Sequence, residues 1–322
     1  MRRSLVILLA ALFALWAGNS SFLRGPAEDA RTRLLAHRGV HQTFSPAAIS
    51  NETCTASRID PPVHDLIENT LASMAAAFAA GAEVVEFDVH PTPDGHVAVF
   101  HDWTLGCRTD GQGVTRDTAW EVLRTLDVGY GYTADGGRTF LLRGTGVGRM
   151  PDLQAVMTAF PDRRFLVNFK SNDMAEGQAF AALVAAHPSW RSQVFAVYGG
   201  EGPTRAAQAA LPGLKGYDRR SVMRCGLTYL ALGWSGYVPA ACRNTILPVP
   251  VDFAFLLWGY PHVLSQRLEA AGTTLALTGP LGDGGFTSGI DTAEIAARVP
   301  PRFDGLVWTN RIREIAPLLN GR

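Results

Sequence analysis

The sequence has no excess of charge of either sign and little charge altogether. Its 322 residues include 29 Lys and Arg against 29 Asp and Glu, and charged residues make up 18% of the chain. A protein that binds nucleic acid through its phosphates needs a basic patch or stripe, which the sequence does not offer, so we exclude nucleic acid as a partner. The apolar content of 47% can supply a sizeable core, which excludes a disordered linker.

Long apolar runs are absent after residue 17. Arg2 and Arg3 precede an unbroken apolar run over residues 5–17, which polar residues 18–21 follow. This run is shorter than the roughly 20 residues that span a bilayer, which favours a signal peptide. Because the cleavage pattern is poor, an uncleaved anchor is the alternative. We expect residues 1–30 to be a signal peptide or an N-terminal membrane anchor with a short linker. The chain should be exported, periplasmic or extracellular, and residues 4–17 would hold it at the cytoplasmic membrane if uncleaved.

Cysteines are few, and none form a C-x-x-C pair that would indicate zinc or redox chemistry. An even number of cysteines agrees with export and with two disulfides. Of the three connectivities, we favour Cys54 with Cys107 and Cys225 with Cys242. Four buried free thiols are the alternative.

Short β-rich runs alternate with helical stretches from residue 33 onward, which is typical of parallel β/α units. Eight such runs predict a TIM (β/α)8 barrel over residues 31–322, although an open doubly wound sheet would give the same pattern. Extra length at residues 40–66 and 89–151 follows the first and second strands, so both insertions should lie on the active-site face. The expected strands are residues 34–37, 83–89, 165–169, 194–197, 214–217, 245–249, 273–277 and 305–308.

Titratable side chains occur where the first two strands end. His37 and Arg38 follow the first strand, and a histidine beside a permanent cation suits proton exchange next to a bound phosphate. Glu86 and Asp88 are two residues apart on the second strand and so share a face. A buried carboxylate pair needs a cation, and oxygen ligands favour Mg²⁺ or Ca²⁺. A solvated face on an edge strand is the alternative.

A hairpin should follow the second strand. Asp94 and Gly95 are a typical turn pair, and the chain after them leads to His101 and Asp102. The hairpin would bring His101 back to the mouth of the barrel, near His37. The two imidazoles could then act as general acid and general base.

Taken together, these motifs resemble the glycerophosphodiester phosphodiesterase family. Order and spacing match as well as residue type, strongly from residue 33 to about 170 and more loosely at residues 304–310. Residues 190–300 match no motif. The matching motifs are Ala36-His37-Arg38-Gly39, Glu68-Asn69-Thr70, residues 81–89, Asp94-Gly95 and His101-Asp102-Trp103-Thr104-Leu105.

The resemblance implies a TIM-barrel phosphoric diester hydrolase that cleaves glycerophosphodiesters into glycerol 3-phosphate and an alcohol. It also implies a divalent cation, Ca²⁺ or Mg²⁺. The residues it implies are His37 and His101 as acid and base, Arg38, Lys170 and Glu68 for substrate and phosphate, and Glu86, Asp88 and Asn168 for the metal. Asn69 and Thr70 follow Glu68 in the same motif and are expected to start the next helix, because both residue types cap helices well.

One position departs from the family pattern. Where the family has Glu-x-Lys on the third strand, this chain has Asn168-Phe169-Lys170. Asn168 can still offer a carbonyl oxygen to the metal, but one negative charge is missing, so we expect lower metal affinity. A similar change occurs at Asn310, where the family often has Asp. We interpret this as a subgroup with a compensating ligand such as Glu68; loss of the metal site is the alternative.

Two later segments bear on the alternatives. Residues 253–260, after the sixth strand, are core or, if exposed, an apolar patch for an acyl chain or a membrane surface. Residues 282–285 are an ordinary turn or a phosphate-binding loop. One alternative function is therefore a lysophospholipid or other lipid phosphodiesterase or lyase. The other is a catalytically inactive cell-surface binding module.

Overall fold

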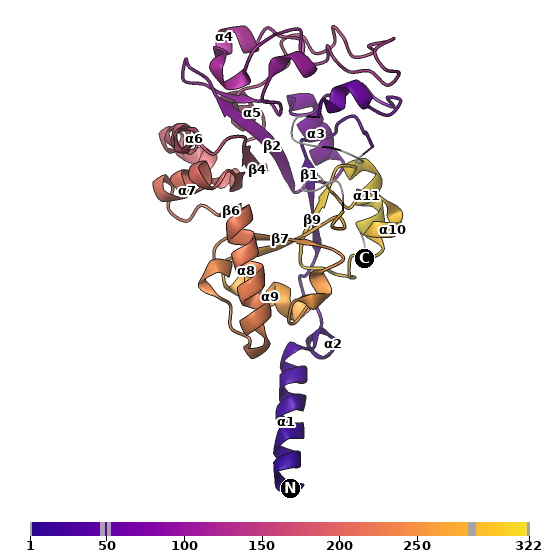
Figure 1. Cartoon of the computed structure of the whole chain (residues 1–322), viewed down its shortest axis with the longest axis vertical. Helices are drawn as coiled ribbons and strands as arrows, with labels where there is room; N and C mark the ends of the chain where they lie inside the picture. Colours follow the sequence, from indigo (N-terminus) through magenta and orange to yellow (C-terminus); the bar gives the residue numbers. More distant parts are fainter. Residues whose placement is uncertain (1, 46–48, 50–52, 283–287, 321–322) are drawn as a thin grey trace.

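Eight parallel strands form a nearly closed barrel in this computed structural model, which describes residues 2–45, 49, 53–282 and 288–320 (Figure 1). The strand order is β6-β5-β4-β2-β1-β9-β8-β7, and β3 pairs antiparallel with β2. At the seam between β6 and β7, the hydroxyl of Thr245 donates to the carbonyl of Gly216 at 2.8 Å. The TIM-barrel prediction is confirmed. The strands are β1 Thr32–His37, β2 Val84–Pro91, β3 Val97–Val99, β4 Arg164–Phe169, β5 Val194–Gly199, β6 Gly216–Asp218, β7 Ile246–Pro250, β8 Thr274–Thr278 and β9 Gly305–Thr309.

Helices lie outside the barrel (Figure 1). The hydroxyl of Thr70 accepts a hydrogen bond from the backbone N–H of Ser73 at 3.3 Å, and this N-cap starts the helix that follows the first insertion. The helices are α1 Arg2–Asn19, α2 Ser21–Arg24, α3 Leu71–Ala79, α4 Trp120–Leu123, α5 Leu153–Ala159, α6 Met174–Ala186, α7 Glu201–Ala210, α8 Arg219–Leu232, α9 His262–Ala270, α10 Ala293–Ala296 and α11 Ile312–Leu319.

Alternation along each strand separates two apolar layers. On β2, Val85, Phe87 and Val89 are buried in the large core that also includes residues of the outer helices. The residues at the alternate positions of the strands point to the other side of the sheet and form a second cluster, which we assign to the barrel interior. That cluster contains Leu35, Val84, Leu166, Ala196, Ile246, Ala276, Leu306 and Trp308. Nearer the carboxyl ends of the strands, the side chains that point to this same side are polar.

The two insertions form a cap with its own small core. Residues 38–70 lie between β1 and α3, and the chain from β3 to α5 contributes the second insertion. Buried side chains from both insertions, among them Ile59, Ile67, Leu123 and Tyr132, pack into one cluster. The prediction of insertions after the first and second strands is confirmed.

Both favoured disulfide pairings are present. Cys54 is bonded to Cys107 across the two insertions, and Cys225 on α8 is bonded to Cys242. The second bond closes a segment with a sequence separation of 17 residues.

Removing the Cys225–Cys242 bond is expected to lower the free energy of unfolding. Closing a loop of this length restricts the unfolded chain by about 3 kcal/mol in the chain-entropy account. Urea unfolding of the double variant Cys225→Ser/Cys242→Ser, compared with wild type, measures the loss. An unchanged free energy of unfolding would contradict the prediction.

Helix α1 extends away from the barrel (Figure 1). Its leucine, valine, isoleucine and phenylalanine side chains over residues 5–13 are exposed, without a polar face between them. At its end, the guanidinium of Arg267 donates to the side-chain oxygen of Asn19 at 2.8 Å and to the carbonyl of Gly18 at 3.0 Å. Within the described ranges, no helix has both the length and the apolar character that crossing a bilayer requires.

Candidate active site

Polar side chains line the barrel directly beyond its apolar interior. His37 on β1 pairs in register with Glu86 on β2, and Asp88 pairs with Asn168 on β4. From β5, the hydroxyl of Tyr198 donates to Glu86 Oε1 at 2.8 Å. Because the strands are parallel, their carboxyl ends bring side chains that are far apart in the sequence to one end of the barrel.

Arg38 connects the acidic residues of the site. Its guanidinium contacts Glu68 Oε1 at 3.1 Å and Asp88 Oδ2 at 3.2 Å, and its backbone N–H donates to Glu86 Oε2 at 3.1 Å. Its φ of 56° lies in the left-handed region, which costs a non-glycine residue about 1–2 kcal/mol. The fold thus maintains a strained backbone that places one arginine among three carboxyl groups.

The two carboxyl groups on β2 are fully buried and differ in charge. Burial and the neighbouring charge of Asp88 raise the pKa of Glu86 to about 8. Burial alone would also raise the pKa of Asp88, but Lys170 and Arg38 hold it well below its usual range. The two carboxyl groups therefore compete for the same cations, and a further cation beside them would lower the pKa of Glu86.

Asn168 and Lys170 both contact the second of these carboxylates. The amide nitrogen of Asn168 donates to Asp88 Oδ1 at 2.8 Å, and the ammonium of Lys170 lies 3.4 Å from the same oxygen. No cluster of three or more His, Cys, Asp or Glu side chains arranged for a metal ion occurs in the described part of the chain. Glu86 and Asp88 nonetheless fit a hard cation by chemistry, because both are buried oxygen donors on one face of β2.

His37 is held in one tautomer by its neighbours. Its Nδ1 lies 2.6 Å from Asn310 Oδ1, and the amide nitrogen of Asn310 donates to Asp291 at 2.7 Å. Because an amide oxygen only accepts, Nδ1 carries the proton and Nε2 presents a lone pair, 3.7 Å from Glu86 Oε2. Burial and the charge of Arg38 lower the pKa of His37 well below its usual value, so the ring is neutral at pH 7.

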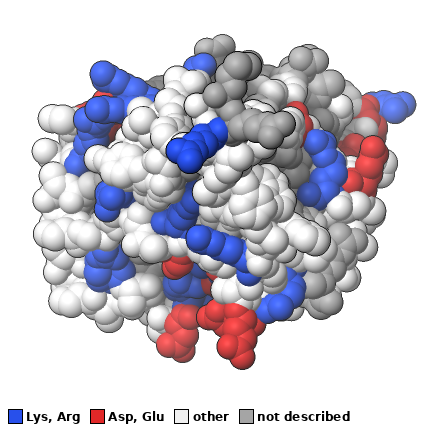
Figure 2. Space-filling model, turned by 90° about the horizontal axis from the view of Figure 1, so that it is seen from below, with Lys and Arg blue, Asp and Glu red and all other residues white. Residues whose placement is uncertain are grey.

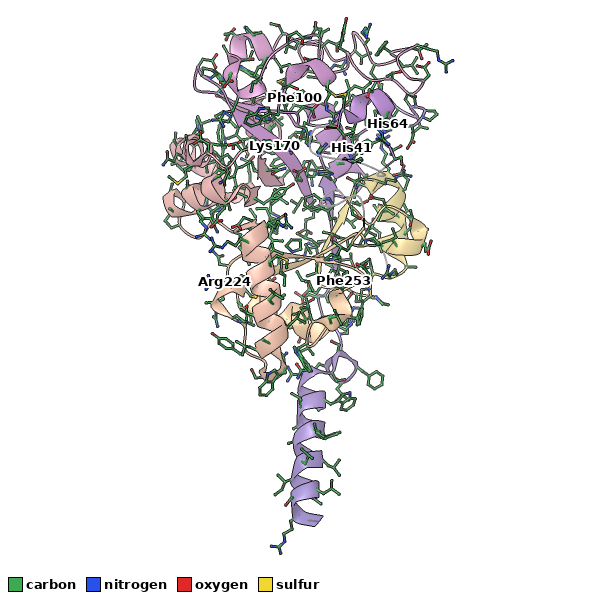
Figure 3. The ribbon with its side chains drawn as sticks, viewed as in Figure 1. His41, His64, Phe100, Lys170, Arg224 and Phe253 are labelled. Atoms are coloured by element: carbon green, nitrogen blue, oxygen red, sulfur yellow. A yellow bond between two sulfur atoms is a disulfide. The ribbon has the colours of Figure 1, made fainter. Side chains whose placement is uncertain are left out.

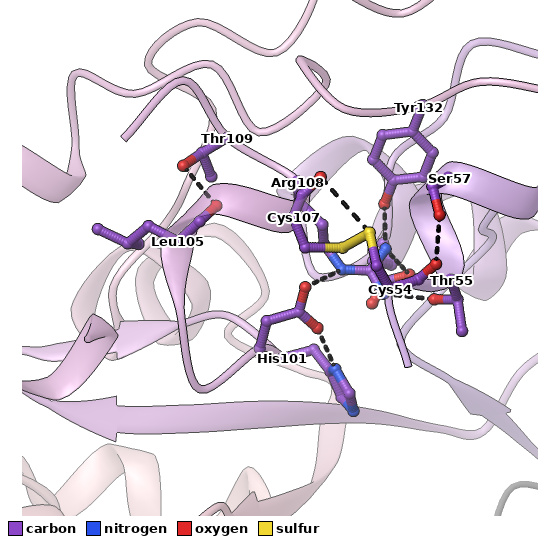
Figure 4. The surroundings of a disulfide bond; sticks show 11 residues. Cys54, Thr55, Ser57, His101, Leu105, Cys107, Arg108, Thr109 and Tyr132 are labelled. Carbon is purple, nitrogen blue, oxygen red and sulfur yellow. Dashed lines mark hydrogen bonds and ion pairs between the residues drawn. A yellow bond between two sulfur atoms is a disulfide. The ribbon is translucent and has the colours of Figure 1, made fainter. Parts of the chain in front are cut away.

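His101 has a different partner. Its Nδ1 lies 2.6 Å from Asp102 Oδ1, so a carboxylate supports it (Figure 4). Burial, Arg38 and Lys170 lower the pKa of His101, and the hydrogen bond to Asp102 opposes them. Both predicted catalytic histidines lie beside β2: Nε2 of His37 is 3.7 Å from Glu86 Oε2, and the backbone N–H of Phe100, the residue before His101, donates to the carbonyl of Asp88 at 3.1 Å.

The structure adds residues that the motifs did not assign. Asn69, expected to start a helix, donates its amide to Asp88 Oδ2 at 3.0 Å instead. Tyr198 directly follows a predicted strand, which was a usable signal for its place in the barrel. Asp291 and Arg108 had no such signal. Residues 282–285, expected as an ordinary turn or a phosphate-binding loop, lie outside the described residues except for Gly282.

A third imidazole, His41, is buried beside the site (Figure 3). Its ring centroid is 6.1 Å from that of His37, and its Nδ1–H donates to the carbonyl of Gln42 at 2.8 Å. Its Nε2 has no hydrogen-bond partner among the described residues. Burial lowers the pKa of His41.

We expect His41→Phe to unfold at a lower pH than wild type. A lowered pKa in the folded state means that the stability contribution of His41 is complete above its ordinary pKa of about 6.5 and is lost as the pH falls below it. Acid titrations followed by circular dichroism give the midpoints, with exposed His187→Gln as the control. Equal midpoints for wild type and His41→Phe would contradict this expectation.

Comparisons with known proteins agree with the fold and the motifs. The sequence model described as "Glycerophosphoryl diester phosphodiesterase family" matches residues 37–189. A glycerophosphodiester phosphodiesterase of Caldanaerobacter subterraneus subsp. tengcongensis is 36% identical over 103 residues, which are 32% of this chain. One of Bacillus altitudinis is 30% identical over 104 residues. The match spans only 39% of the length of each of these two relatives.

Solved structures share the fold at low identity. The glycerophosphoryl diester phosphodiesterase domain of a Mycobacterium tuberculosis protein has a TM-score of 0.61 and 17% identity, with 89% of this chain and 98% of that chain covered. An Oleispira antarctica phosphodiesterase, solved with the product sn-glycerol-3-phosphate, has a TM-score of 0.52 and 17% identity, with 90% and 97% covered. Residues 37–189 of this chain therefore match the glycerophosphoryl diester phosphodiesterase family in sequence, and the ordered motifs and the barrel agree with that match.

Proposed function

We propose that this chain hydrolyses glycerophosphodiesters to glycerol 3-phosphate and an alcohol by acid–base catalysis. The observation that carries the proposal is that two histidines and two cations surround the buried carboxylates of β2. Arg38 and Lys170 contact Asp88, Nε2 of His37 lies 3.7 Å from Glu86, and the residue before His101, Phe100, donates its backbone N–H to the carbonyl of Asp88 at 3.1 Å. The family match over residues 37–189 supports the same reaction.

The different partners of the two histidines suggest their roles. His37, with its bare Nε2 and a neutral amide behind it, is suited to take the proton of the attacking oxygen, from water or from the neighbouring glycerol hydroxyl. His101 is suited to give a proton to the leaving oxygen as the P–O bond breaks, because the carboxylate of Asp102 stabilises its imidazolium against the burial that lowers its pKa. Each proton transfer then uses the Nε2 atom of a ring whose Nδ1 is fixed.

The remaining groups would bind the phosphate and balance its charge. Arg38 and Lys170 are suited to contact the non-bridging oxygens, and Glu68 holds the guanidinium of Arg38. Glu86 and Asp88 would hold a divalent cation, Ca²⁺ or Mg²⁺, with Asn168 turning its amide oxygen toward it. When bound, the cation would neutralise charge on the phosphate.

An exposed apolar patch favours a second candidate substrate class. Phe253, Phe255 and Leu256 follow β7 and are 44%, 69% and 48% exposed. A patch of this kind suits an acyl chain, so a lysophospholipid is the alternative substrate.

The N-terminal helix and the disulfides support an exported, membrane-held barrel over residues 31–322. Disulfides persist in oxidising compartments such as the periplasm and the extracellular space. A helix that is apolar all round needs an apolar surrounding, which a membrane supplies to exposed α1. Viewed from below, the side from which α1 extends, most of the surface is uncharged, with basic side chains scattered over it and acidic side chains near its edge (Figure 2).

Product release tests these proposals. We expect the full chain to release choline from glycerophosphocholine when Ca²⁺ or Mg²⁺ is present, and to lose this activity with a chelator. Faster turnover of lysophosphatidylcholine would favour the lipid substrate. If neither ester is hydrolysed with either ion, the result would contradict an enzymatic function and would favour the alternative of a catalytically inactive binding module.

A further inference from the structure

Arg108 is a fully buried cation that the proposed chemistry does not use. Its guanidinium makes ion pairs with Asp102 Oδ2 at 2.9 Å and Glu68 Oε2 at 3.0 Å. It also donates hydrogen bonds to the hydroxyl of Thr55 at 2.6 Å and to that of Tyr132 at 2.8 Å (Figure 4). Because a buried carboxylate needs a partner, this cation stabilises both acidic side chains.

Both of these carboxylates hold a group of the proposed active site with their other oxygen. Asp102 Oδ1 pairs with Nδ1 of His101 at 2.6 Å. Glu68 Oε1 accepts from the guanidinium of Arg38 at 3.1 Å. Arg108 therefore contacts neither the proposed acid, His101, nor the proposed phosphate ligand, Arg38. One carboxylate lies between Arg108 and each of these groups.

A disulfide holds Arg108 against its hydroxyl partner. Arg108 directly follows Cys107, and Thr55 directly follows Cys54, so the bond between the two cysteines brings these residues together (Figure 4). The two cysteines are 53 positions apart in the sequence and belong to different insertions. Without this disulfide, only non-covalent contacts would hold the two insertions together around the guanidinium.

We propose that Arg108 is a positioning residue that fixes the ring of His101 through Asp102, and that the Cys54–Cys107 disulfide keeps Arg108 in place. The inference rests on the proposed function, because it concerns the orientation of the acid in that reaction. A ring that tilts away from the leaving oxygen slows proton transfer, even where substrate still binds. Reduction of this one disulfide should therefore lower turnover.

Steady-state kinetics of Arg108→Met and Arg108→Lys test the first part. A small misplacement of a reacting group costs about 100-fold, so we expect Arg108→Met to lower kcat on glycerophosphocholine by about that factor. KM should change less than kcat, because Arg38 keeps its contact with Asp88 when Glu68 loses Arg108. Arg108→Lys keeps the charge and should recover part of kcat. Wild-type kcat in Arg108→Met would overturn the proposal.

The Nδ1 proton of His101 gives a readout that does not depend on turnover. Its short hydrogen bond to Asp102 should give an exchange-protected, downfield proton resonance, assigned by its loss in His101→Gln. We expect this resonance to broaden or disappear in Arg108→Met and to persist in Arg116→Met, an ion-paired arginine outside the site. An unchanged resonance in Arg108→Met would overturn the proposal.

The two disulfides provide a matched comparison for the second part. Cys54→Ser/Cys107→Ser should lower kcat and weaken the His101 resonance, whereas Cys225→Ser/Cys242→Ser should change neither at a temperature where both variants are folded. Equal effects of the two removals would overturn the role of the disulfide. If the wild-type chain does not hydrolyse the diester, the proposed function fails, and the resonance alone decides on Arg108.

Discussion

His37→Ala and His101→Ala should each slow hydrolysis of glycerophosphocholine by a factor of roughly 10² to 10⁴, the usual range for a positioned acid or base. Each alanine removes one Nε2 atom from the site and leaves the cations in place. KM should therefore change less than kcat, since Arg38 and Lys170 still bind the phosphate. Initial rates at saturating substrate, with Ca²⁺ or Mg²⁺ present, measure the loss.

The matched control is His96→Ala, because this histidine lies outside the site and pairs with Asp152 at 2.9 Å. Circular dichroism should show that all three variants fold. Near-normal turnover in either His37→Ala or His101→Ala would show that the acid–base assignment is wrong.

Arg38→Met is expected to have the largest effect on stability and to abolish activity. The guanidinium is buried and contacts Glu68 and Asp88, so its removal leaves both carboxylates without one of their cations. Breaking a buried ion pair by removing one partner costs about 3–5 kcal/mol. Urea unfolding should show a loss of this size, and turnover should fall below detection because a phosphate ligand is also lost.

Arg38→Lys and Arg116→Met separate charge from geometry. A lysine keeps the charge at position 38 but lacks the planar fork that reaches two carboxylates, so its stability should lie between wild type and Arg38→Met. Arg116 forms a more exposed ion pair with Asp173 at 2.8 Å, and its removal should cost less than about 1 kcal/mol. Equal losses in Arg38→Met and Arg116→Met would contradict the central position of Arg38.

The strands could be predicted from the sequence because buried parallel strands are apolar on both faces. All eight expected runs coincide with strands of the barrel, and their ends differ by at most two residues. The hairpin β2–β3 was also predictable, since Asp94-Gly95 specifies a turn by local chemistry. These features depend on residues that are neighbours along the chain.

The polar partners of the site depend on contacts between distant segments, and local patterns do not encode them. Asp291 supports His37 through Asn310 from a region without any recognised motif. Arg108 lies seven positions after His101 but acts through Asp102 and Glu68, a geometry that only the folded insertions create. Asn69 was assigned to a helix start because asparagine caps well, but its neighbour Thr70 is the cap.

The position of glycerol 3-phosphate in a crystal structure of its complex with the full chain tests the central claim most directly. We predict that the phosphate lies between the rings of His37 and His101, with Arg38 and Lys170 on its non-bridging oxygens. A phosphate bound elsewhere, or rings that face away from it, would contradict the account.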